Sequence, residues 1–230
     1  MAERSIVITG GFGALGQVVA AAFASQGDNV ARIDFSALAP KPIERCLDLA
    51  GVDLTDAGAV DAAVRAVLKE FDGIDVLINI AGGFAWETIE SGAPATWQRM
   101  FATNLFSNVM MTKAALGALK QSPAGRIINI GAGAAVQATA GMGAYAASKA
   151  GVHRLTEALA CELAGSTVTA NAILPSIIDT PANRADMPDA DTSQWVQPQA
   201  IADAILFLAS RAARSINGAL IPVTRGQLDT

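Results

Sequence analysis

The only tyrosine of this 230-residue chain is Tyr145, and Lys149 follows it four residues later. The run from 143 to 164 predicts a helix, and residues four apart on a helix share a face. A free phenol has a pKa of about 10, which a neighbouring cation lowers by favouring the phenolate. The spacing therefore predicts a general acid/base pair. The alternative is a packed ring beside a solvated charge, and the N-terminal sequence favours the first reading.

A glycine-rich turn is predicted close to the N-terminus. Residues 5–9, Ser-Ile-Val-Ile-Thr, form an apolar run typical of a buried parallel strand, and residues 14–25 predict a helix. Between them, Gly11, Gly13 and Gly16 form the pattern G-x-G-x-x-G. Glycines at such a turn let the backbone approach a pyrophosphate, and the first amides of the helix then hold the phosphates. The turn predicts a dinucleotide-binding site.

An acidic residue completes the motif. The second strand is predicted at residues 29–34 and finishes in Asp34, near the usual spacing of about 20 residues after the glycines. Its carboxylate would accept hydrogen bonds from the ribose hydroxyls of NAD and repel the extra phosphate of NADP. Asp34 therefore favours NAD. Arg32 lies two residues earlier and is expected on the same face of the strand, where its charge could accept the phosphate of NADP, so NADP stays open.

Composition excludes several other classes of protein. Hydrophobic residues make up 52% of the chain and charged residues 16%, which suits a parallel sheet covered on both faces. A net charge of −5 argues against nucleic acid and anionic membranes as partners. One histidine and two distant cysteines, Cys46 and Cys161, predict no metal site and no disulfide. No apolar run spans a bilayer, no signal peptide is expected, and reduced thiols fit a cytoplasmic protein.

The remaining segments alternate between strand and helix. Strands are expected at 45–49, 75–80, 126–130, 168–174 and 219–223, and helices at 56–71, 96–120, 143–164 and 199–210, with a long loop at 176–197. This order predicts an α/β fold: a single Rossmann-type domain over residues 1–230, with a doubly wound parallel sheet flanked by helices. In such folds the ligand site lies beyond the carboxyl ends of the strands.

With these motifs in place, the chain resembles the short-chain dehydrogenase/reductase family over essentially its whole length. The residues that carry the resemblance are the turn 9–16, Asn79-Ile80-Ala81-Gly82, Asn104, the Tyr145/Lys149 pair, and Pro175 with Thr180. The resemblance implies reversible hydride transfer between a nicotinamide and a carbonyl or related acceptor. It also implies that Tyr145 exchanges the proton, that Lys149 binds the nicotinamide ribose and tunes Tyr145, and that Asn104 helps to hold a water.

The same resemblance assigns the cofactor contacts, with Asp53 at the adenine and Pro175 and Thr180 beside the nicotinamide. The full expected set is Gly10, Gly11, Phe12, Gly13, Leu15, Gly16, Asp34, Asp53, Leu54, Asn79, Ala81, Gly82, Tyr145, Lys149, Pro175, Ile178 and Thr180. The chain departs from the family pattern at Ala14, where glycine is usual, and at Ile80, where a second asparagine is usual.

The third departure concerns the catalytic serine of the family, which is replaced by Ala132. Dihydropteridine reductases of the family also lack this serine, and residues 174–184, running into Met187 and Trp195, resemble their substrate loop. Trp86, Met187 and Trp195 are candidates for stacking on a flat acceptor near Ala132, or for packing the loops against the body. These features favour an NADH-dependent reductase, with a quinonoid dihydropterin as the candidate substrate.

Two other functions remain open at this point. One is a carbonyl or 3-oxoacyl reductase that uses another donor in place of the serine, and the other is a dinucleotide sensor without chemistry. By resemblance, the two long helices pack against the same helices of a neighbour, so a homodimer or homotetramer is expected.

Overall fold

The sheet has seven parallel strands in a computed structural model that describes residues 3–225. The strands are β1 (Ser5–Thr9), β2 (Asn29–Ile33), β3 (Cys46–Leu49), β4 (Val76–Asn79), β5 (Arg126–Ile130), β6 (Thr169–Pro175) and β7 (Leu220–Val223). Their order is β3-β2-β1-β4-β5-β6-β7, and every neighbouring pair is parallel. The predicted doubly wound α/β fold is confirmed.

The chain changes direction across the sheet between β1 and β4. The connections from β1 run outward to β2 and β3, whereas the connections from β4 run outward to β5, β6 and β7. The loops that leave β1 and β4 therefore diverge and leave a crevice at the carboxyl ends of these strands. This is the position at which parallel α/β sheets bind ligands.

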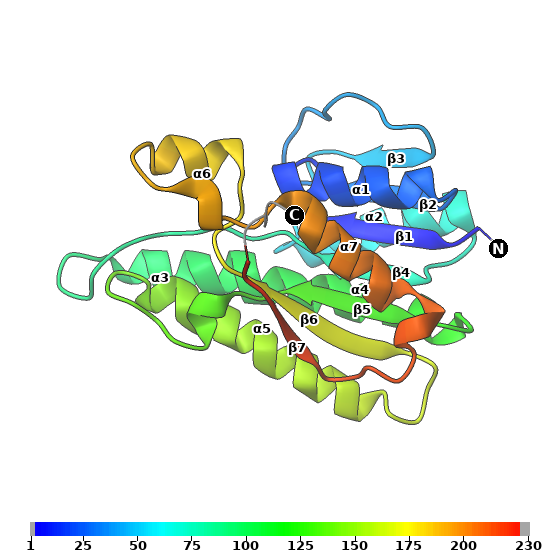
Figure 1. Ribbon diagram of the computed structural model, residues 1–230. Helices are drawn as coiled ribbons and strands as arrows, with labels where there is room; N and C mark the ends of the chain where they lie inside the picture. The colour runs from blue at the N-terminus through cyan, green and yellow to red at the C-terminus, as the bar shows by residue number, and fades with distance from the viewer. Residues whose placement is uncertain (1–2, 226–230) are drawn as a thin grey trace.

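Helices cover both faces of the sheet (Figure 1). They are α1 (Ala14–Ser25), α2 (Ala57–Phe71), α3 (Pro94–Met100), α4 (Ser107–Gln121), α5 (Gly143–Glu162), α6 (Pro181–Asp186) and α7 (Pro198–Ala209). Alternate residues of β1 serve the two faces: Ile6 and Ile8 pack with α1 and α7, whereas Val7 packs with α2, α4 and α5. Two fully buried apolar layers thus hold the strand ends in place.

The helix predicted at 96–120 is not a continuous α-helix. A π-helical segment, Phe101–Phe106, joins α3 to α4, and the Ser107 N–H donates to the carbonyl of Ala102, five residues earlier. The sequence does not reveal this wide turn, because every residue in it is compatible with an α-helix. Its consequence is local: it sets the direction in which Asn104, at its centre, projects.

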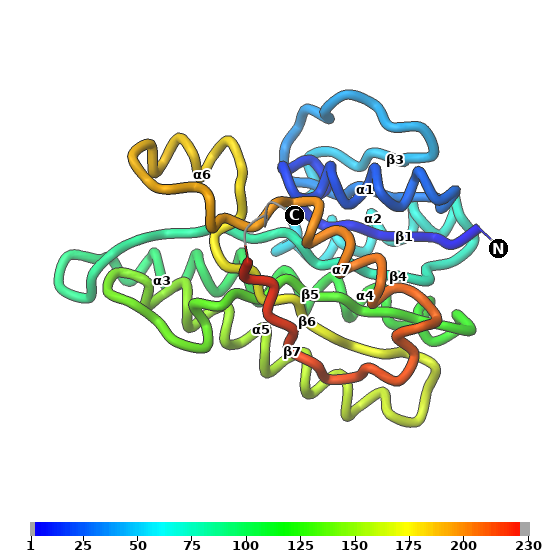
Figure 2. Tube along the Cα trace, in the orientation of Figure 1, coloured from blue at the N-terminus to red at the C-terminus, as the bar shows by residue number. Residues whose placement is uncertain are grey.

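The loop predicted at 176–197 contains regular secondary structure. It contains α6 and a 3₁₀ turn, Thr192–Gln194, and a parallel bridge between Ile178 and Val196 draws its two ends together. Thr180 caps α6 through a hydrogen bond from the Asn183 N–H. The backbone trace in Figure 2 shows this unit standing apart from the sheet, beside the turn that follows β1.

Candidate active site

A cleft of about 660 Å³ opens at the carboxyl ends of β1 and β4, and we call it the main cleft. Ten of the expected cofactor contacts line it: Gly10, Gly13, Leu15, Gly16, Asp34, Asp53, Leu54, Ala81, Gly82 and Thr180. They come from loops far apart in the sequence. The fold therefore brings together most of the residues that the glycine motif and the strand ends indicated.

The glycines of the first turn are required by close backbone packing. Gly10 has a φ of +67°, which side chains rarely tolerate. A Cβ on Gly16 would lie 2.2 Å from the carbonyl oxygen of Gly10 and 2.8 Å from the Cα of Gly11. The start of α1 can thus sit directly on the turn, which leaves its first amides facing the main cleft.

Asp34 is held at the end of β2 by two backbone amides. Its Oδ2 accepts from the Phe12 N–H at 3.0 Å, and its Oδ1 accepts from the Ser36 N–H at 2.9 Å. Arg32 is fully buried and pairs with Asp48 at 2.7 Å, stacked 5.5 Å from the ring of Phe12. Although Arg32 and Asp34 are two residues apart along the chain, Arg32 does not line the main cleft beside Asp34.

Tyr145 lies in the first turn of α5. The ring of Phe84 meets it edge-on, with the ring centres 5.0 Å apart. Burial raises the pKa of the Tyr145 phenol to about 12. The sequence predicted a pKa lowered by Lys149; in the folded chain the shift has the opposite direction, and burial is its cause. The phenol keeps its proton at neutral pH, as a free tyrosine also does.

Lys149 is buried one turn further along α5. Its Nζ donates to the carbonyl of Ile130, the last residue of β5, at 2.7 Å. The same nitrogen would lie 3.4 Å from a Cβ on Gly82, which places it under the loop after β4. Burial lowers the pKa of Lys149 to about 8. An amine with this pKa can take up or release a proton near neutral pH.

Asn104 joins the same loop to α5. Its Oδ1 accepts from the Gly83 N–H at 2.8 Å, and its Nδ2 donates to the Gly83 carbonyl and to the Ser148 hydroxyl, each at 3.0 Å. A Cβ on Gly82 would lie 2.6 Å from that Oδ1. Asn104 and Lys149 thus both lie next to Gly82, and the π-helical turn carries Asn104 to this position.

Ala132 presents only a methyl group at the position where the family carries serine. The residue is 4% exposed, and its N–H donates to Nε2 of His153 at 3.4 Å. Thr139, a hydroxyl later in the same segment, is exposed. His153 is itself buried, and burial lowers the pKa of its imidazole, so a neutral ring supports the loop.

The other expected site residues take different positions. Asn79 does not line the main cleft: its amide donates to Asn108, Thr112 and Asn129 inside the core. Gly11 and Phe12 pack against Arg32, Pro175 ends β6, and Ile178 forms the bridge to Val196.

The three candidates for substrate stacking also differ in exposure. Trp86 is 59% exposed and Met187 is half-buried. The ring of Trp195 is only 4% exposed, so packing of the loop is the reading that its burial supports.

The main cleft also contains residues that the sequence motifs did not indicate. Phe35, Val52 and Thr55 line it beside Asp34 and Asp53, and Arg99, Thr103 and Ser107 line it from the helix that carries Asn104. The residues at 99, 103 and 107 recur at helical spacing, which is the one signal that could have revealed them once Asn104 was placed.

Similarity to known proteins identifies the family. A family model described as short chain dehydrogenase matches residues 4–191. The chain belongs to this family. It is an NAD(P)-dependent oxidoreductase of the short-chain dehydrogenase type, and its glycine turn and ordered carboxylate fit such a nucleotide.

Relatives of this short-chain dehydrogenase have several names. It is 31% identical to a 3-oxoacyl-(acyl-carrier-protein) reductase of Vibrio cholerae, over 96% of this chain and 95% of the other. It is 33% identical to a 2,5-dichloro-2,5-cyclohexadiene-1,4-diol dehydrogenase of Sphingobium indicum, over 98% and 96%. These names do not support the specific resemblance to dihydropteridine reductases.

A solved structure has the same fold. The 3-ketoacyl-(acyl-carrier-protein) reductase of Brucella melitensis, complexed with NADH, superposes with a TM-score of 0.88 at 26% identity, covering 97% of this chain and 98% of the other. Within residues 3–225, no helix is long and apolar enough to cross a membrane, and no three metal-binding side chains come together.

The buried amine predicts a measurable pH dependence of stability. The pKa of Lys149 falls from 10.5 to about 8 on folding. Between these values the unfolded chain binds a proton that the folded chain lacks, so the free energy of unfolding rises with pH. At about 1.36 kcal/mol per pKa unit, the gain over the whole interval is about 3 kcal/mol. Lys149→Met should therefore match or exceed wild-type stability at pH 7 and lose the increase between pH 8 and 10.

Denaturant unfolding across this range measures the effect, with the exposed Lys113→Met on α4 as the matched control. The range stops at pH 10 because the raised pKa of Tyr145 makes the folded state lose stability from pH 10 to 12. Parallel curves for wild type and Lys149→Met would contradict the prediction.

Proposed function

We propose that this short-chain dehydrogenase acts as an NADH-dependent reductase in which Tyr145 alone donates the proton. The observation that carries this proposal is that Ala132 presents a methyl group where the family carries serine, so that Tyr145 is the hydroxyl of the motif that remains. When bound, the nicotinamide supplies the hydride. A tyrosine carries its proton at neutral pH, so Tyr145 can give this proton to the acceptor that receives the hydride.

The roles of the other residues follow from their positions. Lys149, hydrogen-bonded to the Ile130 carbonyl beneath Gly82, would hold the nicotinamide ribose and replace the proton that Tyr145 gives up. Asn104 would link this amine to solvent through a water, because its side chain lies beside Gly82 and Ser148. Together they would return Tyr145 to its protonated form after each turnover.

The preference for NADH rests on the charges at the end of β2. Asp34 lines the main cleft, and Arg32, the cation on the same strand, is buried in its pair with Asp48. A 2′-phosphate would meet the negative charge of Asp34 without compensation from Arg32, whereas ribose hydroxyls could donate to Asp34. Asp53, Leu54 and Phe35 would enclose the adenine.

The acceptor is inferred from what Ala132 lacks. A ketone that becomes an alkoxide in the transition state gains from a second donor, and the loss of one such donor costs about 2.7–4 kcal/mol. A conjugated ring system such as a quinonoid dihydropterin spreads the developing charge and needs only hydride and one proton. We therefore favour a flat conjugated acceptor. A 3-oxoacyl thioester is the second candidate, favoured by the 31% identity to a 3-oxoacyl reductase.

One experiment separates these functions. NADH oxidation is followed with a chemically generated quinonoid dihydropterin, a diketone and an acetoacetyl thioester, and each is repeated with NADPH. We expect turnover with the pterin and NADH. Turnover with the thioester alone would establish the second candidate, and saturable NADH binding without any turnover would establish a sensor.

The variant Ala132→Ser tests the single-donor mechanism. We expect it to raise kcat/KM for the diketone or thioester by about tenfold or more, since one oxyanion donor contributes about 10²–10³ in kcat. Reduction of the conjugated acceptor should change by less than about twofold. Ala134→Ser, in the adjoining 3₁₀ turn Gly133–Ala135, is the matched control. Equal effects on both classes of acceptor would contradict the mechanism.

Assembly and location complete the proposal. We infer a homodimer or homotetramer formed by single-domain subunits through the two long helices, since Trp97, Phe101 and Phe106 are 36%, 39% and 49% exposed on the helix that carries Asn104. A cytoplasmic location is supported by Cys46 and Cys161, which are both free thiols.

A further inference from the structure

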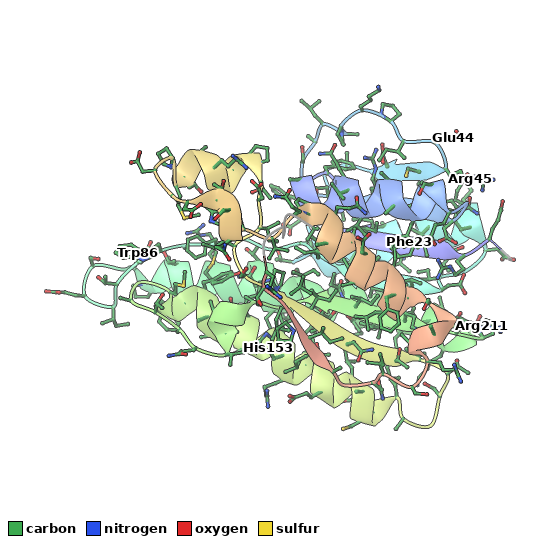
Figure 3. All side chains as sticks on the ribbon, in the orientation of Figure 1. Phe23, Glu44, Arg45, Trp86, His153 and Arg211 are labelled. Atoms are coloured by element: carbon green, nitrogen blue, oxygen red, sulfur yellow. The ribbon has the colours of Figure 1, made fainter. Side chains whose placement is uncertain are left out.

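A second cavity, of about 600 Å³, lies at the opposite end of the sheet from the main cleft. It is lined by Pro123, Ala124, Arg126, Ser166, Thr167, Thr169, Arg211, Arg214 and Ser215. Arg126 and Thr169 are the first residues of β5 and β6, whereas the main cleft lies where the strands end. Figure 3 shows Arg211 at one end of the molecule and Trp86 at the other. The cavity is therefore separate from the proposed active site.

The charge of this cavity is uniformly positive. Three arginines line it, and no aspartate or glutamate does. Within residues 3–225, none of Arg126, Arg211 and Arg214 forms an ion pair, although the chain as a whole carries a net charge of −5. Like charges gathered without a counter-ion repel one another. Water screens this repulsion at the exposed Arg211 and Arg214, and an anion bound among the three guanidinium groups would reduce it further.

Arg126 is the most informative member because it is 3% exposed. Its Nη1 donates to the carbonyls of Gly125 and Thr167 at 2.7 and 3.4 Å, and its Nε has no partner. Burial, followed by the nearby Arg4, lowers the pKa of this guanidinium. The nearby Asp28 pairs with Arg4 at 2.6 Å and forms no ion pair with Arg126.

Hydroxyl groups complete the lining. The Oγ1 of Thr169 is buried without a hydrogen-bond partner, and Ser215 is exposed at the rim. Guanidinium groups with hydroxyl donors match the several oxygens of a phosphate, which accept charge-assisted hydrogen bonds from many directions. A carboxylate-bearing cavity would suit a metal, and an apolar one a hydrocarbon, but this lining offers donors and positive charge.

We propose that the cavity between the starts of β5 and β6 is a binding site for the phosphate group of a small molecule, held by Arg126, Arg211 and Arg214. The two exposed arginines attract the anion and contact its outer oxygens. Arg126 supplies the fixed, buried charge that selects a tetrahedral oxyanion over chloride.

The test uses the whole protein with saturating NADH, so that inorganic phosphate cannot bind in the main cleft. Phosphate binding is measured by calorimetry at constant ionic strength, with chloride as the competing anion. We expect saturable binding that the double variant Arg211→Gln/Arg214→Gln weakens by about tenfold or more, because removing one charge-assisted hydrogen bond lowers the affinity by about a factor of ten. The control Arg65→Gln/Lys69→Gln on α2 removes the same charge from another face and should leave the affinity unchanged.

A second variant, Arg126→Lys, keeps the charge but removes the planar fork, and it should also weaken phosphate binding. If it does not fold, the surface double variant decides the matter alone. Absence of saturable phosphate binding, or equal weakening by the α2 control, would overturn the proposal. The test needs NADH to occupy the main cleft but needs no turnover, so failure of phosphate binding is distinguishable from failure of the proposed activity.

Discussion

Replacing Tyr145 by phenylalanine is expected to lower kcat for NADH-dependent reduction by about 10²–10⁴-fold, the contribution of a positioned general acid. The change removes one oxygen and leaves the ring that Phe84 packs against, 5.0 Å away between ring centres. The affinity for NADH should therefore remain within about twofold, since a group that acts only in the transition state does not contribute to ground-state binding.

Stopped-flow measurement of NADH oxidation and fluorescence titration of NADH binding give the two quantities. Phe84→Leu serves as the control, because it changes the packing around the ring and keeps the hydroxyl; its kcat should fall far less. A Tyr145→Phe variant with an unchanged rate would show that another group, or solvent, provides the proton.

Gly16→Ala is the second change with a large expected effect. The added Cβ would lie 2.2 Å from the Gly10 carbonyl oxygen and 2.8 Å from the Gly11 Cα, and both are backbone atoms. The turn must shift to relieve these contacts, which moves the first amides of α1 away from the phosphates. A displacement near 1 Å can cost about 10²-fold, so kcat/KM for NADH should fall by at least that factor.

Gly117→Ala is the matched control, because nothing lies within 4 Å of the added atom. In the middle of α4 it should stabilise the protein by up to about 1 kcal/mol without changing the kinetics. Steady-state kinetics with varied NADH and thermal unfolding test both variants. Similar kinetics for Gly16→Ala and wild type would mean that the turn does not position the phosphates.

The sequence predicted most of the fold because its elements have strong local signals. The helix α1 begins and ends where the pattern placed it, at Ala14 and Ser25, since the glycine turn and Gly27 bound it. The helix after β4 was predicted less well, because each residue of the π-helical turn is also compatible with an α-helix, so the sequence gives no signal for the wider turn.

The candidate site shows the same division. Motif residues such as Gly16, Asp34 and Lys149 could be placed in advance, because strand ends and helix periodicity fix their location. The pKa of Tyr145 could not be predicted, since it depends on how much of the ring the folded chain buries. Arg32 is a similar case. The sequence shows on which face of the strand it lies, but its pairing with Asp48 depends on the register of β2 and β3.

The wide turn at Phe101–Phe106 has a consequence for the evolution and redesign of this enzyme. A π-helical turn holds one residue more than an α-helical turn, so a single inserted codon is enough to create it and a single deleted codon is enough to erase it. Erasing it would rotate everything on the N-terminal side by about 100° relative to α4. The polar stripe of Arg99 and Thr103 would then leave the main cleft. A redesign that converts this segment into a regular α-helix would therefore remove the side of the main cleft that Arg99 and Thr103 line, even if both residues were kept.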